Sequence, residues 1–290
     1  MSKQPPSLEG FPDQFTAQNS REFYQHYREN GPKKRFTRFA LKAAGVILKP
    51  TVIHRDAEGV RKHLENGGAF VATGNHTSGL DPFEFAAAVG SDETLSPIEQ
   101  PEPRTRILAK ISLFKNKALR WMIEAVGAVP VGRAYESDTE GGKSAREEVI
   151  SFGQDSVADG AHIVLFSQDK RGPVFERSEA KKGAAKIAVG AVEQMQDRPQ
   201  DEQIPVAVLP FGIGYEGEIP EFSFSREIFM HPIDTFKTAI DYVRFARSAT
   251  LTIGSPILVE NGQSVNDDPV NYLHDLTMSG IEEALRQEAA

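Results

Sequence analysis

The run from Ile204 to Ile213 is the most apolar stretch of the chain, and it constrains the fold more strongly than any other feature. A nearly continuous apolar run is typical of a strand that is buried on both faces and therefore lies in the middle of a sheet. Shorter apolar runs alternate along the chain with stretches of helical periodicity. This alternation predicts an α/β fold with a mixed, mainly parallel central sheet covered by helices.

The same patterns, together with Gly and Pro positions, give the element boundaries. Further strands are predicted at residues 69–73, 106–109, 127–131, 162–166, 222–230 and 249–253. Helices are predicted at residues 14–30, 33–49, 60–65, 83–88, 113–126, 143–158, 180–195, 234–247 and 269–287. The predicted organisation is an N-terminal helical segment, residues 1–50, followed by one α/β domain, residues 51–290.

Charge and residue content exclude several classes of protein. A net charge of −8 at pH 7 argues against a nucleic-acid partner, which needs a dominant basic surface. The absence of cysteine excludes disulfides, thiolate metal sites and cysteine nucleophiles. The first residues lack the pattern of a signal peptide, and no apolar run approaches the roughly 20 residues that a membrane span requires. We therefore expect a cytoplasmic protein that does not cross the bilayer.

Residues 33–49 predict a basic amphipathic helix. The segment has six basic residues and no acidic one. Its basic stripe consists of Lys34, Arg38 and Lys42. The apolar stripe on the opposite side consists of Phe36, Phe39, Ala43 and Ile47. Such a helix lies in the interface of an anionic membrane, because apolar burial and attraction to headgroups add. The alternative is a helix that packs on the domain with a solvated basic face, and the pattern alone favours neither.

A histidine and an aspartate lie in the turn that joins the predicted strand 69–73 to the helix after it. The turn has the sequence Gly74-Asn75-His76-Thr77-Ser78-Gly79-Leu80-Asp81-Pro82. Loops at strand ends concentrate catalytic groups because a rigid sheet holds them in place. An alternative is purely structural, since Asp81, Pro82 and Glu84 also fit an N-cap, a first helical position and a capping box.

The chemistry that this turn offers is that of a general base. The five-residue separation lets Asp81 reach one nitrogen of His76, which fixes the tautomer and leaves the other nitrogen to accept a proton from a hydroxyl group. The chain has no Gly-x-Ser-x-Gly elbow, no phosphate-binding P-loop and no dinucleotide fingerprint after a strand. The substrate's own hydroxyl group is then the nucleophile.

The segment from Asn75 to Asp81 resembles the Asn-His-x-x-x-x-Asp block, or HX4D motif, of the glycerolphosphate and lysophosphatidic acid acyltransferase family (1-acyl-sn-glycerol-3-phosphate acyltransferase-like). Three further segments are similar to the family's later blocks, in the same order: residues 108–133, 166–188 and 204–210. The resemblance covers about residues 65–215. The chain departs from it in the third block, where Phe-Pro-Glu-Gly-Thr-Arg is usual. This sequence has Phe166-Ser167-Gln168-Asp169-Lys170-Arg171.

The resemblance implies a mechanism. His76 deprotonates the acceptor hydroxyl, Asp81 orients His76, and the acceptor oxygen attacks the thioester of acyl-CoA or of an acylated carrier protein. It implies no metal and no bound cofactor. Arg133 is expected to bind phosphate through its planar guanidinium group, and the alternative is a surface arginine after a strand. The other expected substrate-binding residues are Asn75, Lys110, Gln168, Arg171, Lys182 and Gly183.

By the same resemblance, the expected function is transfer of a fatty acyl group to a hydroxyl of lysophosphatidic acid or a related lyso-lipid, in phospholipid biosynthesis. Because Gln168 stands in place of the usual glutamate, two alternatives stay open: an acceptor such as a glycolipid, or a lipid-binding relative without activity. Lipid substrates also favour a membrane-surface contact through residues 33–49. The protein is then expected on the cytoplasmic face of the cell membrane, as a peripheral protein.

Overall fold

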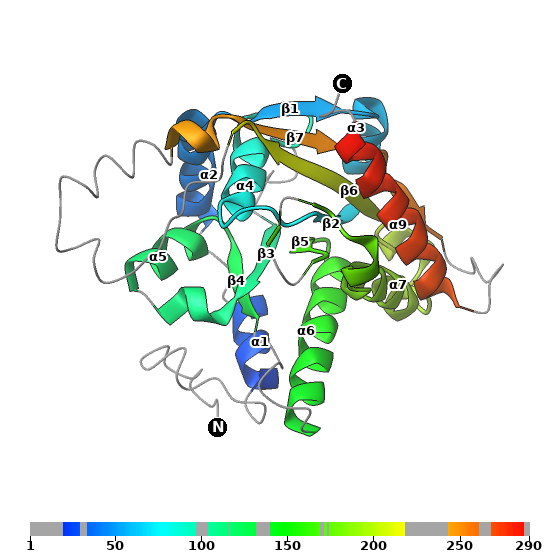
Figure 1. The fold of residues 1–290 in the computed structure, drawn as a ribbon. Helices are drawn as coiled ribbons and strands as arrows, with labels where there is room; N and C mark the ends of the chain where they lie inside the picture. Colours follow the sequence, from blue (N-terminus) through cyan, green and yellow to red (C-terminus); the bar gives the residue numbers. More distant parts are fainter. Residues whose placement is uncertain are drawn as a thin grey trace.

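The computed structural model describes residues 20–29, 34–96, 104–115, 117–131, 140–168, 171–172, 174–217, 243–260 and 268–286. Within these ranges, eight strands form one sheet with helices on both faces (Figure 1). The strands are β1 (Thr51–His54), β2 (Ala69–Gly74), β3 (Thr105–Lys110), β4 (Ala128–Val131), β5 (His162–Phe166), β6 (Val206–Tyr215), β7 (Ala249–Ile253) and β8 (Ile257–Val259).

The strand order is β1-β7-β6-β2-β5-β3-β4, with β8 paired to β6. Strands β6, β2, β5, β3 and β4 are parallel to one another, whereas β7 and β8 pair with β6 in the antiparallel direction. The prediction of a mixed, mainly parallel sheet covered by helices is confirmed. Strand β6, which the apolar run 204–213 predicted, lies inside the sheet, and its residues from Val206 to Ile213 are buried.

The helices are α1 (Ser20–Glu29), α2 (Lys34–Leu48), α3 (Ala57–Glu65), α4 (Asp81–Ser91), α5 (Lys117–Ala125), α6 (Glu140–Ala158), α7 (Gly183–Met195) and α9 (Pro269–Arg286). A short 3-10 helix, η2 (Ile111–Lys115), precedes α5. The predicted strand 222–230 and most of the predicted helix 234–247 lie outside the described residues. Strands β1 and β8 were not predicted, because each is too short to show a pattern.

Alternation along the strands divides the core between the two faces of the sheet. Val71 and Val208 point to one face, where they pack with α1, α6, α7 and α9. Phe70, Ala72 and Leu209 point to the other face, towards α2, α3 and α4. The sheet is therefore the middle layer of three.

Helix α2 packs on α4 through a face that its sequence pattern did not predict. Its buried residues include Thr37, Leu41, Gly45 and Leu48. Gly45 and Gly90 let the two helices approach closely, since a Cβ at Gly90 would lie 2.1 Å from the carbonyl oxygen of Leu41. Residues 34–48 thus contribute to the packed core, and the predicted domain division at residue 50 stays a prediction.

Two residues of the apolar stripe of α2 remain at the surface, so this stripe is not the side that packs on the domain. Phe39 is 69% exposed and Ile47 is 50% exposed. Arg38 and Lys42 are exposed as well, while the side chains of Lys34 and Phe36 lie outside the described part. Helix α2 therefore has one buried face and one face that is both apolar and basic. No helix in the described ranges is long and apolar enough to span a membrane.

Candidate active site

The turn with the His-Asp pair lies at the carboxyl edge of the parallel strands. Strand β2 ends at Gly74, and α4 begins at Asp81. The neighbouring parallel strands β5 and β6 end at Phe166 and Tyr215, on either side of β2. Because parallel strands end at the same edge of a sheet, residues that follow these strands converge there.

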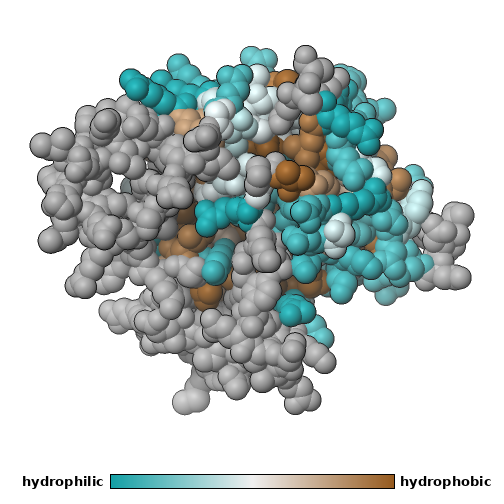
Figure 2. Space-filling model, viewed as in Figure 1, coloured by the Kyte–Doolittle hydropathy of each residue, from teal (hydrophilic) through white to brown (hydrophobic). Residues whose placement is uncertain are grey.

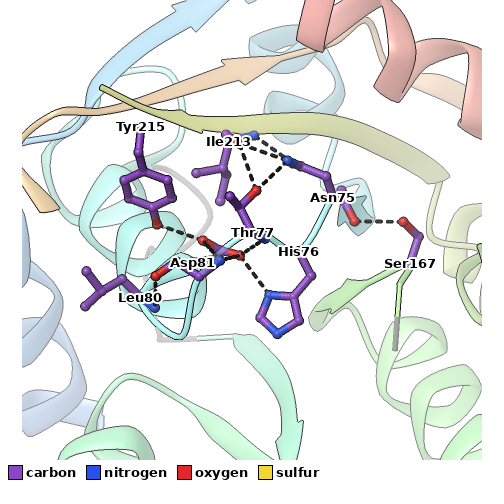
Figure 3. Close-up of polar contacts among 10 residues, drawn as sticks. Asn75, His76, Thr77, Leu80, Asp81, Ser167, Ile213 and Tyr215 are labelled. Atoms are coloured by element: carbon purple, nitrogen blue, oxygen red, sulfur yellow. Dashed lines mark hydrogen bonds and ion pairs between the residues drawn. The ribbon is translucent and has the colours of Figure 1, made fainter. Parts of the chain in front are cut away.

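His76 and Asp81 form a close pair, as the sequence predicted (Figure 3). The Nδ1 atom of His76 lies 2.7 Å from Oδ2 of Asp81, and the side chain of Asp81 is fully buried. A carboxylate only accepts hydrogen bonds, so Nδ1 carries the proton and Nε2 has a free lone pair. The His76 side chain is 17% exposed. The pair therefore has the geometry of a general base with its orienting carboxylate.

Asp81 also organises the turn before α4. The backbone N–H groups of Thr77 and Ser78 donate to its Oδ2 atom at 2.6 and 2.9 Å. These donors belong to the turn and not to the helix, and α4 has no side-chain cap. The capping-box alternative is therefore wrong: Glu84, the residue that it required, makes no hydrogen bond through its carboxylate to any described residue.

The imidazole ring of His76 is held on one side by an aromatic ring. Phe166, the last residue of β5, stacks on it with ring centroids 4.7 Å apart and an interplanar angle of 25°. Phe166 in turn meets Phe211 of β6 edge to face, at 5.8 Å. The orientation of His76 is thus set by Asp81 through Nδ1 and by Phe166 through the ring face.

The amide group of Asn75 joins the turn to β6. Its Nδ2 donates to the carbonyl oxygen of Ile213 at 2.8 Å, and its Oδ1 accepts from the N–H of Ile213 at 2.8 Å. Nδ2 also donates to Thr77 Oγ1 at 2.9 Å. Asn75 is 5% exposed. Its polar atoms are used within the protein, so Asn75 holds the turn, and its predicted contact with substrate stays a prediction.

The segment that resembles the family's third block folds over the same turn. The N–H and the hydroxyl group of Ser167 both donate to the carbonyl oxygen of Gly74, at 2.9 and 2.8 Å. The N–H of Gly172 donates to the carbonyl oxygen of His76 at 3.0 Å. Gln168 is 6% exposed, and its Oε1 atom has no hydrogen-bond partner among the described residues. The structure therefore brings Gln168 to the neighbourhood of the His76 turn.

The remaining predicted substrate-binding residues lie at the same edge or outside the described part. Lys110 is exposed at the end of β3, which is separated from β2 by β5. Arg171 is exposed, and Arg133 lies outside the described residues. Lys182 is exposed and donates to Asn271 of α9, and Gly183 begins α7. The N–H of Lys181 donates to Ser167, so the start of α7 adjoins the third block.

Of two further residues near the pair, sequence reasoning missed Tyr215 and assigned Glu84 only to a helix cap. The hydroxyl group of Tyr215 donates to Oδ1 of Asp81 at 2.7 Å, and burial, followed by the charge of Asp81, raises the pKa of Tyr215 far above its usual range. Glu84 is fully buried one turn after Asp81. Tyr215 is the last residue of β6, and its place just after the most apolar run is the signal that the sequence holds for it.

Three comparisons relate the chain to known proteins. The family model described as Acyltransferase matches residues 55–214, more than half of the chain. A chorismate synthase of Corynebacterium jeikeium (strain K411) is 31% identical over 138 residues, which are 43% of this chain and 32% of that protein. The chain thus spans about a third of the length of this curated relative.

A crystal structure of the 1-acyl-sn-glycerophosphate (LPA) acyltransferase PlsC from Thermotoga maritima also matches. The identity is 14%, the TM-score is 0.43, and the match covers 96% of this chain and 87% of that chain. At this TM-score the likeness carries no argument, and the chorismate synthase match covers a minority of both proteins. The family match is the finding on which a functional proposal rests.

Proposed function

Because the chain belongs to the Acyltransferase family, we propose that it transfers a fatty acyl group from a thioester donor to a hydroxyl of lysophosphatidic acid or a related lyso-lipid, in phospholipid biosynthesis. The donor is acyl-CoA or an acylated carrier protein. One observation carries the proposal: Nδ1 of His76 is bound to the buried Asp81 carboxylate at 2.7 Å, which leaves Nε2 to act as a base.

In the proposed reaction, Nε2 of His76 accepts the proton of the acceptor hydroxyl while its oxygen bonds to the thioester carbonyl carbon. The buried Asp81 carboxylate stabilises the imidazolium that forms. The carbon–sulfur bond then breaks, the carbonyl group forms again, and the imidazolium returns its proton to the thiolate. The products are an ester and a free thiol. The expectation that no metal or cofactor takes part stays a prediction.

An acceptor panel tests this proposal. We expect the purified protein to release free CoA from a long-chain acyl-CoA, and to form an esterified product, when lysophosphatidic acid is present. His76→Ala, at the same concentration, is expected to form none. Thiol release is followed with a chromogenic reagent, and the lipid product is identified by mass spectrometry. Absence of product with every lyso-lipid and both donors would contradict the proposal.

A second candidate acceptor is favoured by Gln168. Its buried Oε1 atom has no hydrogen-bond partner among the described residues, and an amide oxygen accepts a hydrogen bond from a sugar hydroxyl. A hydroxyl of a glycolipid headgroup therefore donates to this atom, whereas the oxygens of an ionised phosphate, which only accept hydrogen bonds, do not. The same panel decides, since turnover of a glycolipid in preference to lysophosphatidic acid supports the second candidate.

We also propose that the exposed face of α2 binds an anionic membrane surface. Phe39, Val46 and Ile47 are at least half exposed, and Lys42 and Lys49 are exposed beside them. By contrast with this exposed face of α2, the side over α7 and α9 is mainly hydrophilic in the view of Figure 2. The last residue of α2, Leu48, packs in the same cluster as Leu80 of the catalytic turn. Membrane contact along α2 therefore brings the lipid surface near His76.

Vesicle binding tests the role of α2. The double substitution Phe39→Ala and Ile47→Ala is expected to weaken binding to vesicles of phosphatidylglycerol and phosphatidylcholine about ten-fold or more, because two apolar side chains no longer enter the interface. The matched control is Tyr272→Ala with Leu276→Ala, two exposed apolar residues of α9. Equal loss in both double variants, or none in the first, would contradict the assignment. Binding is measured by co-sedimentation.

A further inference from the structure

We propose that Tyr215 is a positioning residue for the acyl transfer: its hydroxyl group holds Oδ1 of Asp81 so that Oδ2 faces Nδ1 of His76. The inference rests on the proposed function, because it concerns the same base. Tyr215 lies one residue beyond the part of the chain that the Acyltransferase family model matches. It contributes from β6, 134 residues away from Asp81 in the sequence.

The two oxygens of Asp81 have different partners. Oδ2 accepts from His76 and from the N–H groups of Thr77 and Ser78. Oδ1 accepts from Tyr215 at 2.7 Å and from the N–H of Ser78 at 3.1 Å. Without the hydroxyl group, Oδ1 of this fully buried carboxylate keeps only the longer bond. A buried charge with too few donors is unfavourable, so the carboxylate is expected to rotate away from its orientation towards His76.

Tyr215 is itself held rigidly. Its backbone pairs with Ala249 of β7. Its ring stacks on Phe245, with centroids 4.6 Å apart and an interplanar angle of 14°, and Phe245 is 7% exposed. The raised pKa keeps the phenol protonated, so it remains a donor throughout the assay range. Figure 3 shows Tyr215 and His76 on opposite sides of the Asp81 carboxylate.

The positioning role predicts a change in the hydrogen bond between His76 and Asp81. Once the carboxylate rotates, the hydrogen bond from the Nδ1–H group of His76 to Oδ2 lengthens, so the NMR signal of this proton is expected to move upfield. Among the described residues, the other titratable group of the cluster is Glu84 on α4, and Phe166, which covers the imidazole from β5, carries no charge. The variant leaves both of these residues in place.

The substitution Tyr215→Phe tests the inference, because it keeps the ring and its stacking on Phe245. We expect kcat to fall about ten-fold or more, with KM for the acyl donor nearly unchanged. The Nδ1–H proton signal of His76, read by NMR, is expected to move upfield. Tyr27→Phe is the matched control, since the Tyr27 hydroxyl donates to Glu124 at 3.0 Å, outside the catalytic turn.

An unchanged Nδ1–H signal of His76 in a folded Tyr215→Phe protein would overturn the inference. If that variant does not fold, Phe245→Leu replaces it, since this change keeps the hydroxyl group but loosens its support. The same upfield movement of the signal supports the inference, and an unmoved signal overturns it. The NMR readout needs no turnover. A protein that is inactive with every acceptor but shows the shift contradicts the proposed function and leaves the positioning role of Tyr215 standing.

Discussion

Replacing Asp81 by asparagine is expected to lower kcat by about 10³- to 10⁴-fold, the size of effect seen when the carboxylate of a histidine-based catalytic unit becomes an amide. The amide carries no charge to stabilise the imidazolium. It also offers an N–H₂ group to Nδ1, which favours the tautomer with the proton on Nε2, where the base must be free. The rate of thiol release under saturating donor and acceptor measures the effect.

The same helix supplies a matched control. At the far end of α4, Asp92 accepts from Nε2 of His54 at 2.9 Å, so Asp92→Asn removes the charge from a second His-Asp pair. This variant is expected to keep kcat within about two-fold of the wild type. Because Asp81 also accepts from Thr77 and Ser78, its variant needs a circular dichroism spectrum like that of the wild type. A folded Asp81→Asn protein with more than about a tenth of the wild-type rate would contradict the assigned role.

Local spacing predicted the part of the site that lies within one turn of chain. His76 and Asp81 are five residues apart, and a strand followed by a glycine-containing turn and a helix brings them together with little dependence on the rest of the fold. The same is true of the main elements: strands 162–166 and 249–253 were predicted at their exact bounds, and strand 69–73 within one residue. Patterns of apolar residues are local, so they carry this information.

Contacts between distant segments were not predictable in this way. Tyr215 reaches Asp81 only because β6 lies next to β2 in the register that pairs Gly74 with Phe211. Phe166 meets His76 because β5 lies on the other side of β2. Neither strand order nor register can be read from the residue spacing of one strand. The sequence therefore predicted the base and its carboxylate but not the contacts by which Tyr215 and Phe166 orient them.

The face by which α2 packs was also beyond the pattern. For the alternative in which α2 packs on the domain, the pattern placed the apolar stripe with Phe39 and Ile47 against the domain. Small residues, however, allow the closest approach of two helix backbones. Gly45 meets Ser91 and Gly90 meets Leu41, so packing with α4 selects the glycine side. A periodicity argument weighs residues by hydropathy, and glycine contributes almost nothing to it although it sets the interhelical distance.

Glu84 is expected to make folding stability depend on pH. It is fully buried, neither carboxylate oxygen has a hydrogen-bond partner among the described residues, and it lies one turn from Asp81 on α4. Burial, and then the charge of Asp81, raises its pKa from 4.5 to about 8. Between these values the folded protein holds a proton that the unfolded chain has released. The free energy of unfolding therefore decreases as pH rises through this window, and the stability that the protonated form contributes is fully lost above about pH 8.

The substitution Glu84→Gln removes the titrating group at nearly constant volume. Between about pH 5.5 and pH 8.5, the wild type is expected to lose about 3 kcal/mol of unfolding free energy relative to the variant. Urea unfolding of both proteins at the two pH values measures this difference, and the buried histidines cancel because both proteins contain them. Glu65→Gln, an exposed residue of α3, is expected to show no such difference. A wild type and a Glu84→Gln variant whose stabilities change in parallel with pH would mean that Glu84 keeps an ordinary pKa, because a carboxylate that is already ionised at pH 5.5 gives no slope.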